Sequence, residues 1–242
     1  ALAACPTQTS GPLVPDGNGL VTVPSGTTTI AANAFKGCDD LVTIDFTATT
    51  VLSSIGTDAF NGATGITAFA VPDSVTSLGQ FAFRGSSLAT VTFGPASTLA
   101  SIGYNAFRES GTALTSIAVP DSVTSIGGYA FLNSALATVT FGPASTLASI
   151  GADAFNGATA LTAFVLPDSV TSIGAFAFTD TTSLTAITYT ANSTLASIGT
   201  DAFQGATALK AFAVPDSVTS LGEYAFRGSS LATVTFGPAS TL

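Results

Sequence analysis

Apolar side chains recur along the chain in two short phrases separated by polar turns. In residues 71–93, the first phrase is Val-x-x-Leu over 75–78 and the second is Leu-x-x-Val-x-Phe over 88–93. The second spacing turns three side chains inward, while its third and fifth positions, here Thr90 and Thr92, face outward on a strand. The pattern therefore predicts a short β-strand with one buried face at the second phrase of every unit.

The dipeptide Ala-Phe marks one unit of an internal repeat and occurs nine times. Its Phe stands at 35, 60, 83, 107, 131, 155, 178, 203 and 226, in steps of 23 to 25 residues. The phrase Pro-Asp-Ser-Val begins at 72, 120, 167 and 215, so two kinds of unit alternate. Units this short cannot bury an apolar face alone and have to stack. We therefore expect a β-rich solenoid of the leucine-rich-repeat type, with nine repeats of about 24 residues in pairs of about 48.

The repeat covers residues 23–242, which we expect to form a single solenoid domain. Residues 1–22 lack the repeat and are rich in Pro and Gly between 11 and 19, which suggests a cap over the first repeat. The chain stops at Gly237-Pro-Ala-Ser-Thr-Leu242, a phrase that elsewhere opens a new unit. We therefore predict no C-terminal cap, and the sequence is either a fragment of a longer array or a subunit with an open end.

The repeating phrase resembles the BspA-like leucine-rich repeats. It reads Ser-Val-Thr-Ser-Ile-Gly, then Ala-Phe, then Leu-x-x-Ile-x-Val/Ile/Phe-Pro, and nine copies make the likeness specific. That family often carries Cys a few residues after Ala-Phe, whereas here only Cys38 does so. The resemblance implies a secreted or cell-surface protein. Some members of the family act in adhesion to host matrix proteins or to other cells.

Composition excludes several classes of function. The chain has no His, so it cannot build a Ser-His-Asp triad, a Cys-His pair or an imidazole metal site. Its net charge of −9 argues against nucleic acid, whose phosphates need a basic face. No uncharged apolar run reaches the roughly 18 residues that would span a bilayer. We therefore expect no cofactor, no nucleic-acid partner and no membrane insertion.

Charged residues follow the repeat and do not converge. The Asp residues form two ladders. Within each ladder, successive residues are one double repeat apart, about 9–10 Å, and this distance is too long for paired acid/base chemistry or a shared cation. The first ladder consists of turn formers, Asp73, Asp121, Asp168 and Asp216, and the second of Asp58, Asp153 and Asp201, with Asn105 in register. Four cations, Lys36, Arg84, Arg108 and Arg227, directly follow Ala-Phe and suggest a sparse stripe that serves solubility. We predict no catalytic site and no metal site.

The two cysteines, Cys5 and Cys38, are the only pair available for a disulfide. Such a bond would join the cap to the solenoid and add about 3–4 kcal/mol by loop entropy. One alternative is a buried thiol at Cys38 and an unrelated Cys5. Another is a lipidated Cys5 in a lipobox over residues 2–5, but this would need an upstream apolar segment. The opening Ala-Leu-Ala also fits the trace of a removed signal peptide.

The outward strand positions form a face of small and hydroxyl side chains. Its Thr residues are Thr90, Thr92, Thr138, Thr140, Thr188, Thr233 and Thr235. The simplest interpretation is that Thr combines β propensity with solubility. Ice binding and O-glycosylation are alternatives, although Ala rows interrupt the Thr rows, and Asn192 begins an N-glycosylation sequon. Because this face carries no Tyr, Trp or Arg, we expect no tight, selective ligand site there.

The open end is the predicted site of self-association. Uncovered apolar side chains and an unpaired strand edge form a template for another chain. The C-terminal side comprises Phe226, Leu231, Val234, Phe236 and Leu242, and the N-terminal side comprises Leu20, Val21, Val23 and Ile30. Head-to-tail contact between these two sides would generate a filament. We therefore predict a non-catalytic extracellular structural protein that associates with itself, or alternatively an adhesin region that binds surface or matrix proteins.

Overall fold

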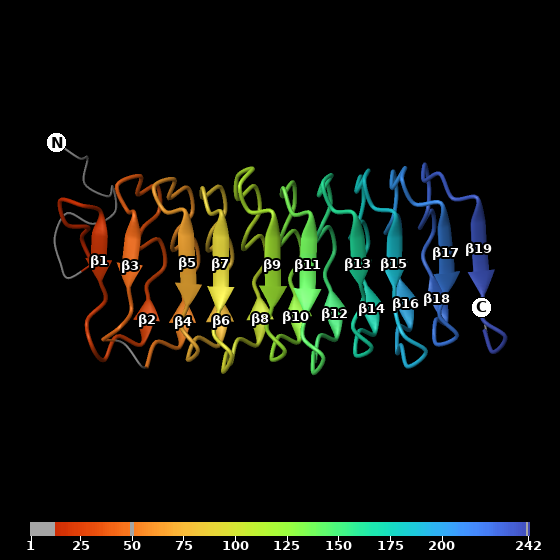
Figure 1. Cartoon of the computed structure of the whole chain (residues 1–242), viewed down its shortest axis with the longest axis horizontal. Helices are drawn as coiled ribbons and strands as arrows, with labels where there is room; N and C mark the ends of the chain where they lie inside the picture. Colours follow the sequence, from red (N-terminus) through yellow and green to blue (C-terminus); the bar gives the residue numbers. More distant parts are fainter. Residues whose placement is uncertain (1–12, 49–50, 241) are drawn as a thin grey trace.

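A computed structural model describes residues 13–48, 51–240 and 242. In this part of the chain, the backbone winds into about nine turns of a parallel β-solenoid and forms no helix (Figure 1). Each turn contributes one strand to each of two rows, here called row A and row B, and the turns stack along one axis. The architecture confirms the fold class predicted from the repeat.

Row A carries the Leu-x-x-Leu-x-Leu phrases, and its strands all run in the same direction (Figure 1). They pair in parallel two at a time, so the double repeat of the sequence reappears as five two-stranded ladders in the described residues. Paired strands begin 22 or 23 residues apart, whereas neighbouring pairs are separated by 25 or 26. The strands are β1 (Leu20–Thr22), β3 (Thr43–Asp45), β5 (Ala68–Val71), β7 (Thr90–Phe93), β9 (Ser116–Val119), β11 (Thr138–Phe141), β13 (Ala163–Val165), β15 (Ala186–Thr188), β17 (Ala211–Val214) and β19 (Thr233–Phe236).

Row B is one continuous sheet of two-residue strands, most of which pair Ser with Ser and Ile with Ile or Leu. The strands are β2 (Thr29–Ile30), β4 (Ser54–Ile55), β6 (Ser77–Leu78), β8 (Ser101–Ile102), β10 (Ser125–Ile126), β12 (Ser149–Ile150), β14 (Ser172–Ile173), β16 (Ser197–Ile198) and β18 (Ser220–Leu221). Beside this row, N–H groups donate to the preceding turn, as Gly127 N does to Ile102 O at 2.8 Å. A Cβ on Gly127 would lie 2.8 Å from the backbone of Gly103, so glycine is needed for this close stacking.

The Ala-Phe turns form the third side of the solenoid. The residue before Ala-Phe has a φ between 53° and 60° in all nine turns. Here N–H groups donate to the following turn, as Phe81 N does to Tyr104 O at 2.9 Å and Phe83 N to Ala106 O at 2.8 Å. Asn or Asp fits the left-handed conformation, but an aromatic residue there is an outlier that costs about 1–2 kcal/mol. Four turns nevertheless place an aromatic residue at this position, namely Phe81, Tyr129, Phe176 and Tyr224.

The Phe rings of the nine Ala-Phe dipeptides form one continuous stack through the core. Adjacent ring centroids are 5.0–5.5 Å apart and the rings are within 12° of parallel. Phe69, Phe164 and Phe212 of row A meet this stack at steep angles. Because the ring spacing is close to the strand spacing of about 4.8 Å, the stack and the backbone share one period.

In the Pro-Asp turns, the Asp side chain fills space that is left by a glycine after the next row A strand. A Cβ on Gly142 would lie 2.2 Å from Oδ1 of Asp121, so the carboxylate occupies the space that a side chain would fill. That Oδ1 is buried and has no hydrogen-bond partner. At the equivalent place one double repeat later, Thr190 replaces glycine and its hydroxyl donates to Oδ1 of Asp168 at 2.7 Å. The same contact therefore exists in a glycine form and a threonine form.

The first strand of the solenoid lies inside the segment predicted to be a cap. β1 pairs in register with β3, so residues 20–22 share the row A ladder. Just before it, Oδ1 of Asp16 accepts hydrogen bonds from the N–H groups of Asn18 and Leu20, and these bonds lower the pKa of Asp16. Residues 1–12 lie outside the described residues, so capping by that segment stays a prediction.

Replacing Phe131 with Ala should lower the free energy of unfolding by about 3–5 kcal/mol. Its ring is fully buried and stacks on Phe107 and Phe155 at 5.5 and 5.3 Å. Urea unfolding followed by circular dichroism measures the loss. Val165→Ala is the control, because Val165 is 62% exposed and should change the stability by less than about 0.5 kcal/mol. Equal effects of the two substitutions would mean that the stack does not hold the turns together.

Candidate functional site

The Thr residues predicted on the strand face lie exposed on row A. They are Thr90, Thr92, Thr138, Thr140, Thr188, Thr233 and Thr235. Thr90 lies opposite Ala68 and Thr140 opposite Ala118, so strands rich in Thr alternate with strands that carry smaller side chains. Ice binding and glycan attachment at this face stay predictions. The outward positions offer no aromatic or Arg side chain as an anchor for a ligand.

The two sides of the predicted association interface differ in exposure. At the C-terminal turn, Val234 and Phe236 are 40% and 53% exposed. At the N-terminal turn, Val21, Val23 and Ile30 are at most 1% exposed and belong to the core. A second copy would therefore find no apolar surface at these three side chains. Of the other predicted residues, Leu242 is exposed, and Phe226, Leu231 and Leu20 are half-buried.

Two further predicted sites are the disulfide at Cys38 and the glycosylation sequon at Asn192. Cys38 is fully buried, and no free cysteine occurs among the described residues. Cys5 lies outside the described residues, so its pairing with Cys38 stays a prediction. Asn192 is exposed in the turn between β15 and β16, where an enzyme could reach the sequon. Its glycosylation also stays a prediction.

Residues that flank the Ala-Phe dipeptides form a polar edge, here called the Ala-Phe rim. The four cations predicted there as a stripe for solubility are all in ion pairs. The pairs are Lys36–Asp58 at 3.4 Å, Arg84–Glu109 at 3.5 Å, Arg108–Glu109 at 3.1 Å and Arg227–Asp201 at 3.2 Å. Asp201 is buried, but the other pairs are exposed or half-buried; exposed pairs contribute at most about 1 kcal/mol, so their main effect is to orient side chains.

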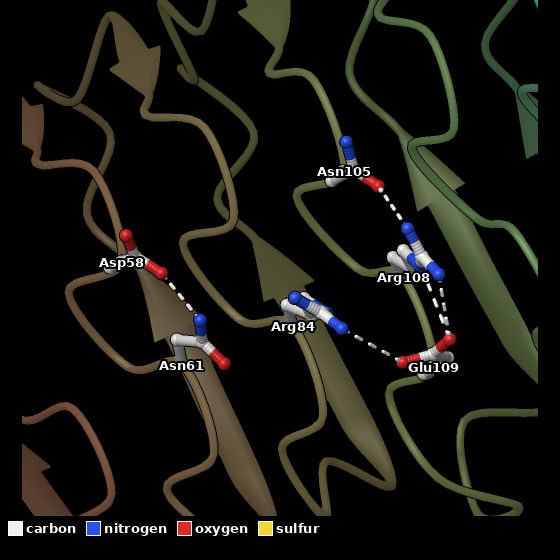
Figure 2. Close-up of polar contacts among 6 residues, drawn as sticks. All are labelled: Asp58, Asn61, Arg84, Asn105, Arg108 and Glu109. Atoms are coloured by element: carbon white, nitrogen blue, oxygen red, sulfur yellow. Dashed lines mark hydrogen bonds and ion pairs between the residues drawn. The ribbon is translucent and has the colours of Figure 1, made fainter.

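The densest part of the rim is centred on Glu109. Arg84 and Arg108, from consecutive turns, both reach its carboxylate, and Arg108 Nη1 also donates to Asn105 Oδ1 at 3.5 Å (Figure 2). Farther along the rim, Asn61 Nδ2 donates to Asp58 Oδ1 (Figure 2). The sequence pattern did not single out Glu109, because contacts between turns depend on side-chain direction.

Three aromatic rings lie beside this cluster and form what we call the aromatic ledge. Tyr104 meets Phe81 with ring centroids 6.2 Å apart and Tyr129 with centroids 5.3 Å apart, both nearly edge to face. Tyr104 is 43% exposed. A Cβ on Gly128 would lie 3.1 Å from the Tyr104 ring, so glycine leaves space for that ring. The sequence contains a signal for the aromatic ledge that the repeat analysis did not use, because an aromatic residue precedes Ala-Phe in every second turn.

Charged groups frame the ledge on both sides. The carboxylate of Asp153 raises the pKa of Tyr129, first through its negative charge and then through a hydrogen bond. Asp153 also accepts a hydrogen bond from Asn156 Nδ2 at 2.7 Å. On the other side, the Arg84 guanidinium lies over the Phe81 ring, 5.8 Å from its centroid. The exposed Tyr104 ring and the half-buried Tyr129 ring beside Arg have the composition of a protein-binding hot spot.

Among the described residues, no three His, Cys, Asp or Glu side chains are grouped closely enough to hold a metal ion. Within residues 13–48, 51–240 and 242, no helix is long and apolar enough to cross a bilayer. The Asp ladders lie in separate turns, and the predicted turn role of the first is confirmed, since Val75 N donates to Pro72 O around Asp73.

Comparison with known families identifies the repeat. The family model described as "BspA type Leucine rich repeat region (6 copies)" matches residues 20–138 and 136–241. No curated protein matches the chain. The likeness to this family therefore rests on the repeat itself over nearly the whole described length.

Two solved structures illustrate the similarity of fold. A leucine-rich cell surface protein from Faecalibacterium prausnitzii A2-165 is 24% identical, with a TM-score of 0.60 over 92% of this chain and 70% of that one. The pneumococcal vaccine antigen PcpA is 23% identical, with a TM-score of 0.59 over 91% of this chain. This chain spans 62% of the length of that antigen. At these identities the comparison shows a shared fold alone.

Replacing Asp153 with Asn should lower the pKa of Tyr129 toward the ordinary tyrosine value. The negative charge of Asp153 opposes formation of the phenolate, so its removal lets Tyr129 lose its proton at lower pH. Ultraviolet difference absorbance during an alkaline titration measures this change. Asp121→Asn is the control, because that carboxylate packs on Gly142 in a Pro-Asp turn. Identical tyrosine titrations in all three proteins would contradict the Tyr129–Asp153 contact.

Proposed function

Because the chain belongs to the BspA-type leucine-rich repeat family, we propose that it is a non-catalytic protein displayed outside the cell that binds other surface or matrix proteins. A neighbour of similar fold is described as a cell surface protein and another as a vaccine antigen, which supports display at the surface. The rigid stack of turns supplies a long scaffold, as repeat proteins use for binding.

The aromatic ledge is the observation that carries this proposal. Tyr104 projects from one turn between aromatic rings of the turns before and after it. Arg84 and Arg108 are held in place by Glu109, so their positions are ordered before a partner arrives. Ordered aromatic and Arg side chains bind with little loss of conformational entropy. The ledge is thus the best anchor for a protein partner among the described surfaces.

Chemistry on a substrate has little support in the same residues. The chain has no His, and the rim carboxylates of Asp58, Glu109 and Asp153 contact Lys, Arg and Asn side chains of the rim itself. A general acid or base works best with a pKa near the operating pH. A carboxylate that is already engaged with a neighbouring side chain is less available to exchange a proton with a substrate.

Binding to immobilised extracellular matrix proteins tests the function. We expect the double variant Tyr104→Ala with Tyr129→Ala to bind at least about tenfold more weakly than the unaltered chain, as loss of a hot spot would predict. Thr92→Ala with Thr140→Ala alters the exposed strand face and is the matched control, expected to bind normally. Failure of the unaltered chain to bind any protein of the panel, or full binding by the ledge variant, would contradict the proposal.

Self-association through the C-terminal turn is a second candidate. Val234 and Phe236 are exposed there, and β19 is the last strand of row A. In a longer array the next turn would cover the same side chains. For a polypeptide of these 242 residues, we propose that a second copy covers them. Because the predicted N-terminal residues are buried, a contact between two C-terminal turns is easier to form than one between a C-terminal and an N-terminal turn.

Assembly can be measured across a concentration series by light scattering and negative-stain electron microscopy. Val234→Glu and Phe236→Asp should each keep the chain monomeric, because a charge would enter the apolar contact. Val165→Glu places the same charge on the strand face and should leave assembly unchanged. A monomer at every concentration of the unaltered chain would end this second proposal without affecting binding at the ledge.

We also propose that Cys5 and Cys38 form a disulfide, which fits an extracellular location. Without reduction, a thiol-alkylating reagent should leave the unfolded protein unmodified, and after reduction it should modify both cysteines. Cys5→Ser should lower the free energy of unfolding by about 3–4 kcal/mol. Cys5→Ser in a reduced sample is the control and should match the reduced parent. Alkylation of the unreduced protein would exclude the bond.

A further inference from the structure

A row of three hollows lies beside the turns that follow the row A strands. These turns lie along the lower edge of Figure 1. Their volumes are about 260, 280 and 290 Å³. Gly142 lines both the first and the second hollow, and Thr190 lines both the second and the third. Because neighbours share these residues, the hollows form one continuous row.

Each hollow repeats the same chemistry. One wall carries a half-buried aromatic ring at the end of the preceding row A strand, and the other carries a Pro-Asp-Ser turn. The residues are Phe93, Pro120 and Asp121 in the first hollow, Phe141, Pro167 and Asp168 in the second, and Tyr189, Pro215 and Asp216 in the third. Pro95 and Pro143 add a second proline to the first two. Aromatic and proline rings form flat walls of the kind that hold a proline side chain.

The spacing of the hollows selects an extended ligand. Equivalent hollows are two turns of the solenoid apart, which is about 10–11 Å at the ring spacings of 5.5, 5.3, 5.2 and 5.4 Å in these turns. A polyproline II helix completes a turn in about three residues and about 9.3 Å. Over the three hollows the two periods drift apart by about 3 Å, which is no more than the rise of one residue of such a helix. One turn of such a helix can therefore occupy each hollow, with the same face turned inward every time.

The charge of the row selects a basic ligand. Each hollow is lined by one Asp, and no Lys or Arg lines any of the three. Oδ1 of Asp121 is buried without a hydrogen-bond partner, whereas Oδ1 of Asp168 accepts from Thr190. In the third hollow, burial and the nearby Asp216 carboxylate raise the pKa of Tyr189, so ring and carboxylate lie together. A cation at every third residue of the ligand would meet one carboxylate in each hollow.

We propose that this row binds a proline-rich, basic segment of another protein in the polyproline II conformation, with one turn of the ligand in each hollow. Proline-rich segments commonly dock in aromatic-lined grooves, because their conformation is already fixed before binding. This site lies in the Pro-Asp turns, whereas the aromatic ledge lies on the Ala-Phe rim. The inference therefore adds a second binding site to the proposed function, and it can fail separately from the aromatic ledge.

Fluorescence anisotropy with a labelled peptide of three Pro-Pro-Lys repeats tests the inference. We expect saturable binding that weakens as salt is added. A peptide of Pro-Pro-Glu repeats tests the charge, and one of Pro-Pro-Gly-Lys repeats tests the period, because its cations fall out of step with the hollows. Both should bind much more weakly. Equal binding of all three peptides would overturn the proposal.

Variants locate the binding on the chain. Asp168→Asn should weaken binding of the Pro-Pro-Lys peptide about two- to fivefold, and the triple change of Asp121, Asp168 and Asp216 to Asn about tenfold or more. Asp153→Asn removes a similar charge from the Ala-Phe rim and should leave the affinity unchanged. An equal loss of affinity with Asp153→Asn would mean that binding depends on net charge alone, and it would overturn the proposed site.

Two further results complete the test. Tyr104→Ala should bind the Pro-Pro-Lys peptide normally, which separates this site from the aromatic ledge. A soluble neutral polysaccharide is the competing ligand, since extended sugars also stack on aromatic rings. If the polysaccharide binds, loses affinity with Phe141→Ala, and the peptide does not bind, the row is a glycan site and the proposal is wrong.

Discussion

The stack of nine phenylalanine rings sets the period to which the rest of the molecule conforms. Rings that lie parallel at 5.0–5.5 Å require each turn to advance by nearly the same distance as its neighbour. Backbone hydrogen bonds between strands demand almost the same advance. The close approach at Gly127 and the left-handed residue before each Ala-Phe follow from this common period, because both allow one turn to rest directly on the next.

Sequence periodicity predicted the architecture because the core repeats with every turn. Ala-Phe and the Leu-x-x-Leu-x-Leu phrase identify buried positions, and most of these are buried in the structure, although the last position of the phrase is half-buried at Phe93 and Phe141. The rim was harder to foresee, because a positive φ at Phe81 and Tyr129 turns their side chains toward other turns. The ends were harder for a different reason. The sequence predicted that Val21 and Ile30 form an apolar face available to a second copy, yet both side chains are buried within the first turn.

The core and the surface have different periods. The ring stack repeats every turn, whereas the row A ladders, the aromatic residues before Ala-Phe and the hollows repeat every second turn. Surface features can thus change in one type of unit without altering the residues that hold the stack together. Thr190 is an example, since it replaces the glycine of other units at a turn while the neighbouring Phe178 and Phe203 remain stacked.

The directions of the hydrogen bonds have a consequence for length. Along the Ala-Phe turns, N–H groups point toward the following turn, whereas beside row B they point toward the preceding one. In an α-helix all peptide dipoles align and their effect concentrates at the two ends. Here the peptide dipoles on two sides of each turn oppose one another and partly cancel. Further turns can therefore join such an array without building up opposite partial charges at its ends, so its electrostatics place little limit on how many turns it contains.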